Sequence, residues 1–158
     1  MASELSKTAR VGRDNQRYSD VGERLVAGIV ALSATKDQVL LVQSTRRGGW
    51  VLPKGGWETD EITAEDAAKR EAWEEAGVIV SIDRDLGYIY DHRKPDEMTT
   101  HAPKAKYQFF EVSIEEEKSE WPEQEKRDRK WMNYAGAKEA LKDRPELLAA
   151  LERSSIQK

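Results

Sequence analysis

Residues 55–78 (GGWETDEITAEDAAKREAWEEAGV) constrain the fold of this chain more than any other segment. A glycine pair opens the segment, and the residues after it carry the signals of a helix with a defined start and end. Thr63 and Asp66 have the spacing of a capping box with Asp in place of the usual Glu, and Gly77 is a typical C-terminal stop. Alanines, which favour the helix, recur between these signals at Ala64, Ala67, Ala68, Ala72 and Ala76.

Three glutamates of this predicted helix fall on one face. At about 100° per residue, Glu71, Glu74 and Glu75 lie within an arc of roughly 100°. Residues 64–68 place small alanines on the same stripe, one and two turns earlier. Because small side chains allow close packing on a sheet, we expect the glutamates to continue a stripe that faces inward.

Such a carboxylate cluster needs a counter-charge. Like charges three or four residues apart destabilise a helix by roughly 0.2–0.5 kcal/mol per pair, and partial burial raises that cost unless a cation compensates. Ligands that offer only oxygen favour a hard ion, Mg²⁺ first and Mn²⁺ as a substitute. The alternative for an isolated EAWEE motif is a solvated acidic helix face.

The wider pattern resembles the Nudix box, the signature of the Nudix hydrolases. That box runs Gly, five residues, Glu, seven residues, Arg-Glu, an apolar residue, any residue, Glu-Glu, any residue, Gly and an apolar residue. Gly56 lies at the box distance from Arg70, and residues 70–78 (REAWEEAGV) match the rest. Ile62 stands where the isolated Glu belongs, and Glu61 comes one residue early, so the match is weaker at Glu61 than on the helix.

The resemblance implies a fold of the α/β (α+β) class, an α/β/α sandwich with a mixed central sheet. Apolar and alternating patterns agree with it: strands are expected at 25–32, 38–43, 50–52, 78–82, 86–91, 106–114 and 130–134, and helices at 135–141 and 145–153. With 158 residues, the chain suits a single domain over residues 1–158. Residues 1–20 are polar, so we expect an extended or partly disordered segment.

The composition of the chain bears on its cellular compartment and on its partners. The chain has no cysteine, no run of 18 apolar residues and no apolar segment near its start that would act as a signal peptide. These features predict a protein of the cytoplasm or nucleus, although a removed leader would leave no trace. The formal net charge of −4 argues against a general affinity for nucleic acid, and neither a membrane nor an oligomeric partner is expected.

Basic residues nevertheless gather in groups at the ends of predicted strands. They include Arg46, Lys54, Arg93, Lys104, Lys106 and Arg127, with Arg10 and Arg13 in the N-terminal segment. Taken alone, each of these basic groups is more typical of a solvated surface than of a binding site. Around one acidic metal site, however, Arg forks and Lys charges are typical phosphate ligands. The sequence thus suggests a small-molecule substrate with more phosphates than one anhydride requires.

Beyond the box, the chain is similar to the fungal diphosphoinositol polyphosphate phosphohydrolases, a group that also cleaves diadenosine polyphosphates. The similar stretches are TARVGRDNQRYS at 8–19, RLVAG at 24–28, WVLPKGGWE at 50–58, REAWEEAG at 70–77 and RPELLAALERSSI at 144–156. In that group the N-terminal segment is ordered against the domain and supplies basic residues. Carried over by position, the resemblance implies a polyphosphate site lined by Arg24, Ser44, Arg46, Gly55, Gly56, Lys104, Lys106, Arg127 and Arg144.

The resemblance also implies the chemistry. Glu71, Glu74 and Glu75 bind Mg²⁺ together with Gly55, and one glutamate, of which Glu74 is favoured, doubles as the general base. Arg70 lies off the carboxylate stripe and orients a glutamate through a salt bridge. Phosphoanhydrides of diphosphoinositol polyphosphates are the expected substrates, with diadenosine polyphosphates and inorganic polyphosphate as further ones.

Two other functions remain open on the sequence. One is a different Nudix activity, such as mRNA decapping or dinucleoside polyphosphate hydrolysis as the main role. The other is a sensor that binds a phosphorylated ligand without cleaving it, and the presence of all three helix glutamates argues against that role.

Overall fold

The structure, a computed structural model, describes residues 5–46, 48–91 and 104–158. Its centre is a mixed seven-stranded sheet with the order β3-β2-β1-β6-β5, in which β4 also pairs with β1 and β7 with β2. The strands are β1 (Arg24–Leu32), β2 (Val39–Gln43), β3 (Trp50–Val51), β4 (Lys54–Gly56), β5 (Val78–Tyr90), β6 (Ala105–Glu117) and β7 (Arg129–Met132). The helices are α1 (Ala64–Ala76), α2 (Tyr134–Ala140) and α3 (Pro145–Arg153).

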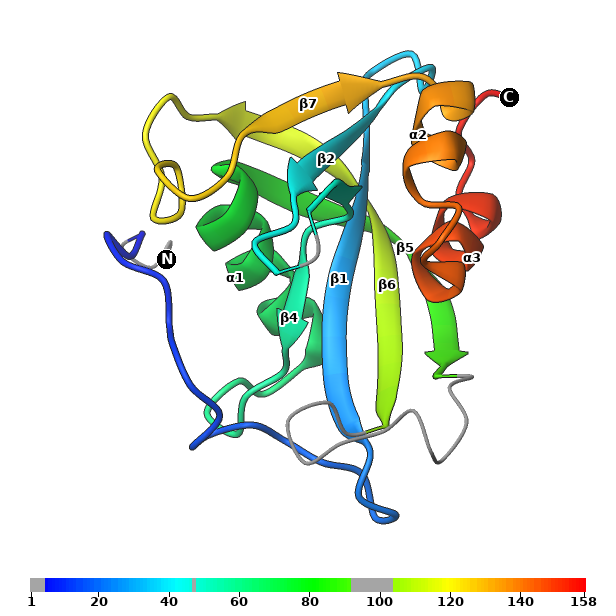
Figure 1. Cartoon of the computed structure of the whole chain (residues 1–158). Helices are drawn as coiled ribbons and strands as arrows, with labels where there is room; N and C mark the ends of the chain where they lie inside the picture. Colours follow the sequence, from blue (N-terminus) through cyan, green and yellow to red (C-terminus); the bar gives the residue numbers. More distant parts are fainter. Residues whose placement is uncertain (1–4, 47, 92–103) are drawn as a thin grey trace.

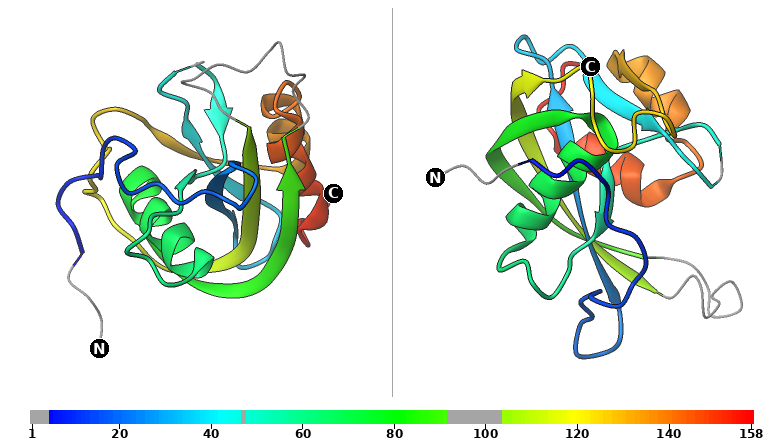
Figure 2. Two further views of the ribbon diagram at one scale, coloured as in Figure 1. Left: turned by 90° about the horizontal axis from the view of Figure 1, so that it is seen from below. Right: turned by 90° about the vertical axis from the view of Figure 1, so that its left-hand side faces the viewer.

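Helices cover both faces of this sheet. Figure 1 shows α1 on one side and the pair α2 and α3 on the other, and the view from below in Figure 2 shows the same three layers. The expected α/β/α sandwich with a mixed sheet is thus confirmed. Among the described residues, no helix has the length and apolar content needed to cross a membrane.

Strand β1 is the middle of the fold because its run of apolar residues is buried from Val26 to Leu32. It pairs in parallel with β6 over its whole length, from Arg24 opposite Ala105 to Leu32 opposite Ser113. Its other edge is shared: β4 pairs antiparallel with Val26–Gly28, and β2 meets only the far end, at Leu32. The glycine pair, for which no strand was expected, lies in the short strand β4, and β2 and β4 diverge along β1.

Helix α1 packs as its alanine stripe predicts. All five alanines are buried, and Ala67, Ala68, Ala72 and Ala76 are fully enclosed. Thr63 caps the start, its Oγ1 accepting from the Asp66 N–H at 3.1 Å, and Gly77 ends the helix with a left-handed φ of 68°. The signals for this helix are local, which is why the sequence predicts its bounds closely.

Other predicted boundaries change where tertiary contacts act. The two strands expected at 78–82 and 86–91 form the single strand β5, whose pairing with β6 is interrupted by three register shifts. Gly87, with a left-handed φ of 85°, lies in the last of these irregular stretches. The sequence pattern breaks there because a bulge interrupts the alternation, while the strand itself continues.

The N-terminal segment from residue 5 onward is extended and lies along the domain, past α1 and β4 (Figures 1 and 2). Trp73 on α1 donates to the Ser6 carbonyl at 2.8 Å. Arg10 forms ion pairs with Glu58 and Asp60 at 2.6 and 2.8 Å. The Arg17 guanidinium stacks 4.5 Å from the centroid of the Trp57 ring. These contacts attach the extended segment to α1 and to the residues that follow β4.

We expect Ala68→Leu to destabilise the protein because α1 has no space for a larger side chain at this fully enclosed position. Overpacking of this kind typically costs about 1–3 kcal/mol. The free energy of unfolding in urea measures the effect. Lys69→Leu adds bulk at the next, exposed position of the same helix and should leave stability near that of the wild type. Equal losses in both variants would contradict the assigned packing face.

Candidate functional site

The three predicted glutamates lie together on the inner face of α1 and are buried. Glu71, Glu74 and Glu75 are 7%, 2% and 8% exposed, so they are not a solvated acidic face. The alternative of a solvated helix surface is therefore wrong. The helix brings the carboxylates against β4, where the Lys54 N–H donates to Glu75 at 3.1 Å.

The glycine pair of β4 makes room for polar side chains. A Cβ at Gly55 would lie 2.1 Å from Oε1 of Glu71. A Cβ at Gly56 would lie 2.0 Å from Oε1 of Gln16. Non-bonded atoms do not approach this closely, so a larger residue at either position would displace the carboxylate or the amide beside it. Gly55 therefore leaves space for the Glu71 carboxylate, and Gly56 leaves space for the Gln16 amide.

Arg70 holds the carboxylates of the box together. Its Nη1 lies 2.9 Å from Glu71 and 3.1 Å from Glu74, while its Nε and Nη2 bond both oxygens of Glu61 at 2.8 and 3.0 Å. Nη2 also donates to the Gly56 carbonyl at 2.7 Å. The expected role of Arg70, orienting a glutamate through a salt bridge, agrees with this geometry.

Glu61 is a correction to the sequence interpretation, which gave it less weight for being one residue out of register. The side chain is 8% exposed and accepts bonds from Arg70 and from the Glu58 N–H. Its spacing of five residues from Gly55 is kept, and the additional residue falls between Glu61 and Arg70. Ile62, which occupies the formal box position, is 86% exposed and precedes the helix cap. Glu61 thus bonds Arg70 despite the additional residue between them.

The segment between β6 and β7 closes the site above the end of α1. The Glu123 N–H donates to the Glu74 carbonyl at 3.0 Å, and Trp121 Nε1 donates to the Glu75 carbonyl at 3.1 Å. These bonds satisfy carbonyls that the last helical turn leaves without partners. They also fix Glu123 as a fourth carboxylate facing the cluster, and the sequence analysis did not identify it.

Arg127 belongs to the same segment and is tied down by the protein itself. Its Nε pairs with Glu123 at 2.7 Å, its Nη1 donates to the Gln43 carbonyl at 2.9 Å, and its Nη2 lies 3.7 Å from Glu75. Its positive charge therefore offsets two carboxylates of the site. That contact limits the charge it has left for a substrate.

Burial gives the carboxylates unusual acidities. Burial first, and then the charge of Glu75, raises the pKa of Glu71 to about 8. Burial and the charge of Glu71 raise the pKa of Glu74 to about 7. Burial also raises the pKa of Glu75, against the opposing charges of Arg127 and Lys54. The folded protein thus holds a set of carboxylates whose ionisation is disfavoured by their own surroundings.

This donor set fits a hard divalent cation. In the described part of the chain, no three acidic or histidine side chains already stand as a metal cage. Instead, carboxylate oxygens of Glu71 and Glu74 pair with Arg70. Those of Glu75 contact Arg127 and the Lys54 N–H. Even so, the three carboxylates lie on one buried helix face, where desolvation and mutual repulsion disfavour their ionised forms. A bound Mg²⁺ would offset both effects.

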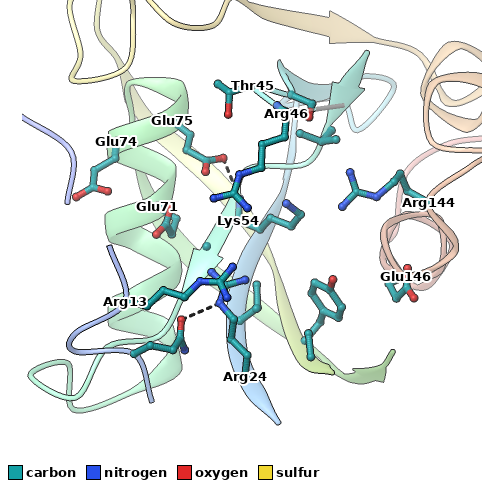
Figure 3. Close-up of a pocket in the computed structure, with 18 of the residues that line it drawn as sticks. Arg13, Arg24, Thr45, Arg46, Lys54, Glu71, Glu74, Glu75, Arg144 and Glu146 are labelled. Atoms are coloured by element: carbon teal, nitrogen blue, oxygen red, sulfur yellow. Dashed lines mark hydrogen bonds between the residues drawn. The ribbon is translucent and has the colours of Figure 1, made fainter. Parts of the chain in front are cut away.

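A pocket of about 700 Å³ lies in front of the carboxylates. In Figure 3, Glu71, Glu74 and Glu75 form one side, Arg144 and Glu146 the opposite side, and four cationic side chains lie between them. These four are Arg13 from the N-terminal segment, Arg24 from β1, Arg46 from the connection after β2 and Lys54 from β4. Within the described residues, the side chains of Arg13, Arg46 and Lys54 form no hydrogen bond or ion pair.

The cations repel one another. Burial first, and then the charges of Arg13 and Arg46 among others, lowers the pKa of Arg24. Burial, and then Arg144 and Arg24, lowers the pKa of Lys54 to about 8, although Glu75 opposes the shift. An anion between these groups would remove the repulsion. The site therefore has an acidic wall suited to a cation and a basic cluster suited to a polyanion.

Most of the predicted substrate residues are brought to this pocket. Its lining includes Arg24, Ser44, Arg46, Lys54, Gly55, Gly56, Arg127 and Arg144. Lys104 and Lys106 are not part of it: Lys104 is exposed, and the Lys106 ammonium lies 4.2 Å from the centroid of the Tyr88 ring. Arg93 lies outside the described residues.

Several lining residues were not predicted, among them Gln16, Tyr107, Glu123 and Glu146, whereas Arg10 and Arg13 were noted only as part of a basic group. Only the two arginines had a sequence signal, a basic character in an otherwise polar segment. The others depend on how distant segments meet.

The raised pKa values predict that the metal-free protein loses stability as pH rises from about 4.5 to about 8. In this window the folded state holds protons on Glu71 and Glu74 that the unfolded chain has already released, so each rise in pH favours unfolding. Melting temperature in the presence of a chelator measures the effect. Added Mg²⁺ should raise Tm more at pH 8 than at pH 5.

Glu71→Gln is the matched control, because an amide mimics the protonated carboxyl and should flatten this dependence. An unchanged slope in that variant would show that other groups cause it.

Comparisons with known proteins agree with this geometry. The NUDIX domain family model matches residues 22–151. The chain is 38% identical to "Nudix hydrolase 13, mitochondrial" of Arabidopsis thaliana over 85% of this chain and 73% of that protein. It is 36% identical to "Nudix hydrolase 4" of the same plant, over 88% and 69%.

Solved structures agree on the fold. A NUDIX hydrolase from Nitrosomonas europaea superposes with a TM-score of 0.69 at 16% identity, covering 83% of this chain and 87% of that one. An Ap4A hydrolase from C. elegans superposes with a TM-score of 0.60 at 21% identity, covering 82% and 93%. With its box glutamates buried on one face of α1 and the family model matched across the fold, this chain belongs to the Nudix family of hydrolases.

Proposed function

We propose that this Nudix hydrolase cleaves the phosphoanhydride bonds of diphosphoinositol polyphosphates in a Mg²⁺-dependent reaction that yields an inositol phosphate and orthophosphate. The observation that carries the proposal is the basic cluster of Arg13, Arg24, Arg46, Lys54 and Arg144 facing the acidic wall. One anhydride near a metal site needs few cations. Five in a single pocket suit a substrate that carries phosphates around its whole perimeter.

The apolar part of the pocket supports the same substrate class. Tyr107 is the single aromatic residue among the described residues that line it, beside a few aliphatic side chains. Nucleotide bases are commonly held by aromatic or apolar surfaces, whereas a phosphorylated cyclitol needs charges and hydrogen bonds. Diadenosine polyphosphates are the second candidate, because the same cations would bind their phosphate chain.

Glu71, Glu74 and Glu75 would hold Mg²⁺, with Gly55 beside Glu71. When bound, the metal polarises a phosphoanhydride oxygen and lowers the pKa of the attacking water. Glu74 is our candidate for the general base, because its carboxylate lines the pocket beside Glu71 and is held in place by its neighbours. Arg70 and the Arg10 N–H, which bond the two oxygens of Glu74 at 3.1 and 3.2 Å, orient this carboxylate.

The substrate assignment predicts a ranking of specificity constants. With Mg²⁺, the purified protein should show a higher kcat/KM for a diphosphoinositol polyphosphate than for a diadenosine polyphosphate, inorganic polyphosphate or capped RNA. Phosphate release measures the first and third, and chromatographic separation of nucleotides measures the others. If capped RNA is much the best substrate, the assignment fails and decapping replaces it.

The metal site predicts that Glu75→Gln lowers turnover by about a hundredfold or more while the protein still folds, because the amide removes one anionic oxygen donor. Turnover at saturating substrate and a thermal melt measure the two effects. Glu65→Gln changes an exposed carboxylate of the same helix and should turn over at the wild-type rate. A fully active Glu75→Gln enzyme would show that the metal binds elsewhere.

A further inference from the structure

Gln16 is a buried polar side chain that reaches the pocket from the N-terminal segment. It is 7% exposed. Its Nε2 donates to the Arg17 and Leu25 carbonyls at 2.8 Å each and to the Trp57 carbonyl at 3.2 Å. These bonds fix the amide between the segment, β1 and the residue after β4. The rotamer of Gln16 is therefore determined by the backbone around it.

The remaining polar atom of this amide is aimed at the basic cluster. Oε1 of Gln16 accepts from Nε of Arg24 at 2.9 Å. Arg24 starts β1 and lines the pocket, and within the described part of the chain it has no ion pair. A guanidinium has five N–H donors, so a bond at Nε leaves the two terminal nitrogens directed away from Gln16.

The neutral character of this partner matters. A carboxylate at the same place would also orient Arg24, but it would cancel the charge that a polyanion needs. Arg70 illustrates that arrangement, because its guanidinium is consumed by Glu61, Glu71 and Glu74. An amide oxygen orients the fork and leaves its full charge for a ligand.

We propose that Gln16 is a positioning residue that aims Arg24 at substrate phosphates, and that Gly56 is glycine in order to admit the Gln16 amide. The proposal deepens the proposed function and rests on its assignment of this pocket to a polyphosphate. Gly56 pairs with Val26 across β4 and β1, two residues from Arg24. A Cβ at Gly56 would occupy the place of Gln16 Oε1, the atom that bonds Arg24. Residues 16, 24 and 56 thus form one unit.

The test is a double-mutant cycle on anion affinity, measured by calorimetry without metal, with myo-inositol hexakisphosphate and inorganic tripolyphosphate as probes. Arg24→Ala should weaken binding of the hexakisphosphate about tenfold, and Gln16→Met, close in size but without the amide, about fivefold. In the Arg24→Ala background, Gln16→Met should have no further effect. Independent, multiplying losses would overturn the proposal, because Gln16 would then act without Arg24.

Arg17→Ala is the matched control for a general loosening of the N-terminal segment. Arg17 anchors the same segment through the Thr59 and Glu61 carbonyls and the Trp57 ring, but it does not line the pocket. It should bind both probes with near wild-type affinity. If Arg17→Ala weakens binding as much as Gln16→Met, then Gln16 has only a structural role.

Gly56→Ala provides a second route should Gln16→Met fold poorly. The added methyl displaces the amide, so this variant should weaken binding as Gln16→Met does and show the same lack of additivity with Arg24→Ala. In turnover, both variants should raise KM for the highly phosphorylated substrate more than they lower kcat. A fall in kcat alone would contradict a positioning role for Arg24.

The two levels of the argument fail differently. If the protein binds the probes with a non-additive cycle but does not hydrolyse diphosphoinositol polyphosphates, then the proposed function is wrong and the role of Gln16 stands. If the protein hydrolyses diphosphoinositol polyphosphates but the cycle is additive, then the role of Gln16 is wrong and the proposed function stands. Wild-type protein that binds neither probe would overturn the role of Gln16.

Discussion

The guanidinium of Arg70 is the contact on which the rest of the site depends. Glutamates spaced three and four apart on one buried helix face would repel one another and favour protonation. Arg70 bonds Glu71 and Glu74 on its own helix, Glu61 before the helix and the Gly56 carbonyl on β4. Removing one partner of such a buried ionic set typically costs about 3–5 kcal/mol. The residue thus fixes α1 to the sheet while it keeps the acidic wall assembled.

The other parts of the fold complete this wall from outside. The segment between β6 and β7 caps the carbonyls at the end of α1 and brings in Glu123 and Arg127. The N-terminal segment also reaches this wall and bonds Glu74 through the Arg10 N–H. Both are outside the Nudix box. The box therefore supplies three carboxylates and the arginine that pairs with two of them, and residues remote in sequence add further bonds to this set.

Much of this architecture could be predicted from the sequence, because its signals are local. Thr63, Gly77 and the alanine stripe define α1, and the apolar run of β1 defines the sheet centre. Glu61 was given little weight because it is one residue out of register, yet its carboxylate bonds Arg70 across the additional residue. Lys106 shows the opposite failure. It is basic and follows the expected pattern, yet its ammonium lies against Tyr88 and not in the pocket.

The parallel pairing of β1 with β6 has a consequence for how the molecule is made. The carboxylates of the box are encoded before residue 80, but the neighbour that covers the apolar strand β1 begins only at Ala105. A partly synthesised chain that already contains the whole box still lacks Phe109 and Phe110, two of the largest enclosed core side chains. Such long-range pairing slows folding and leaves apolar surface open meanwhile. During translation, the box therefore cannot reach its folded arrangement until β6, which contains no residue of the box, has been synthesised.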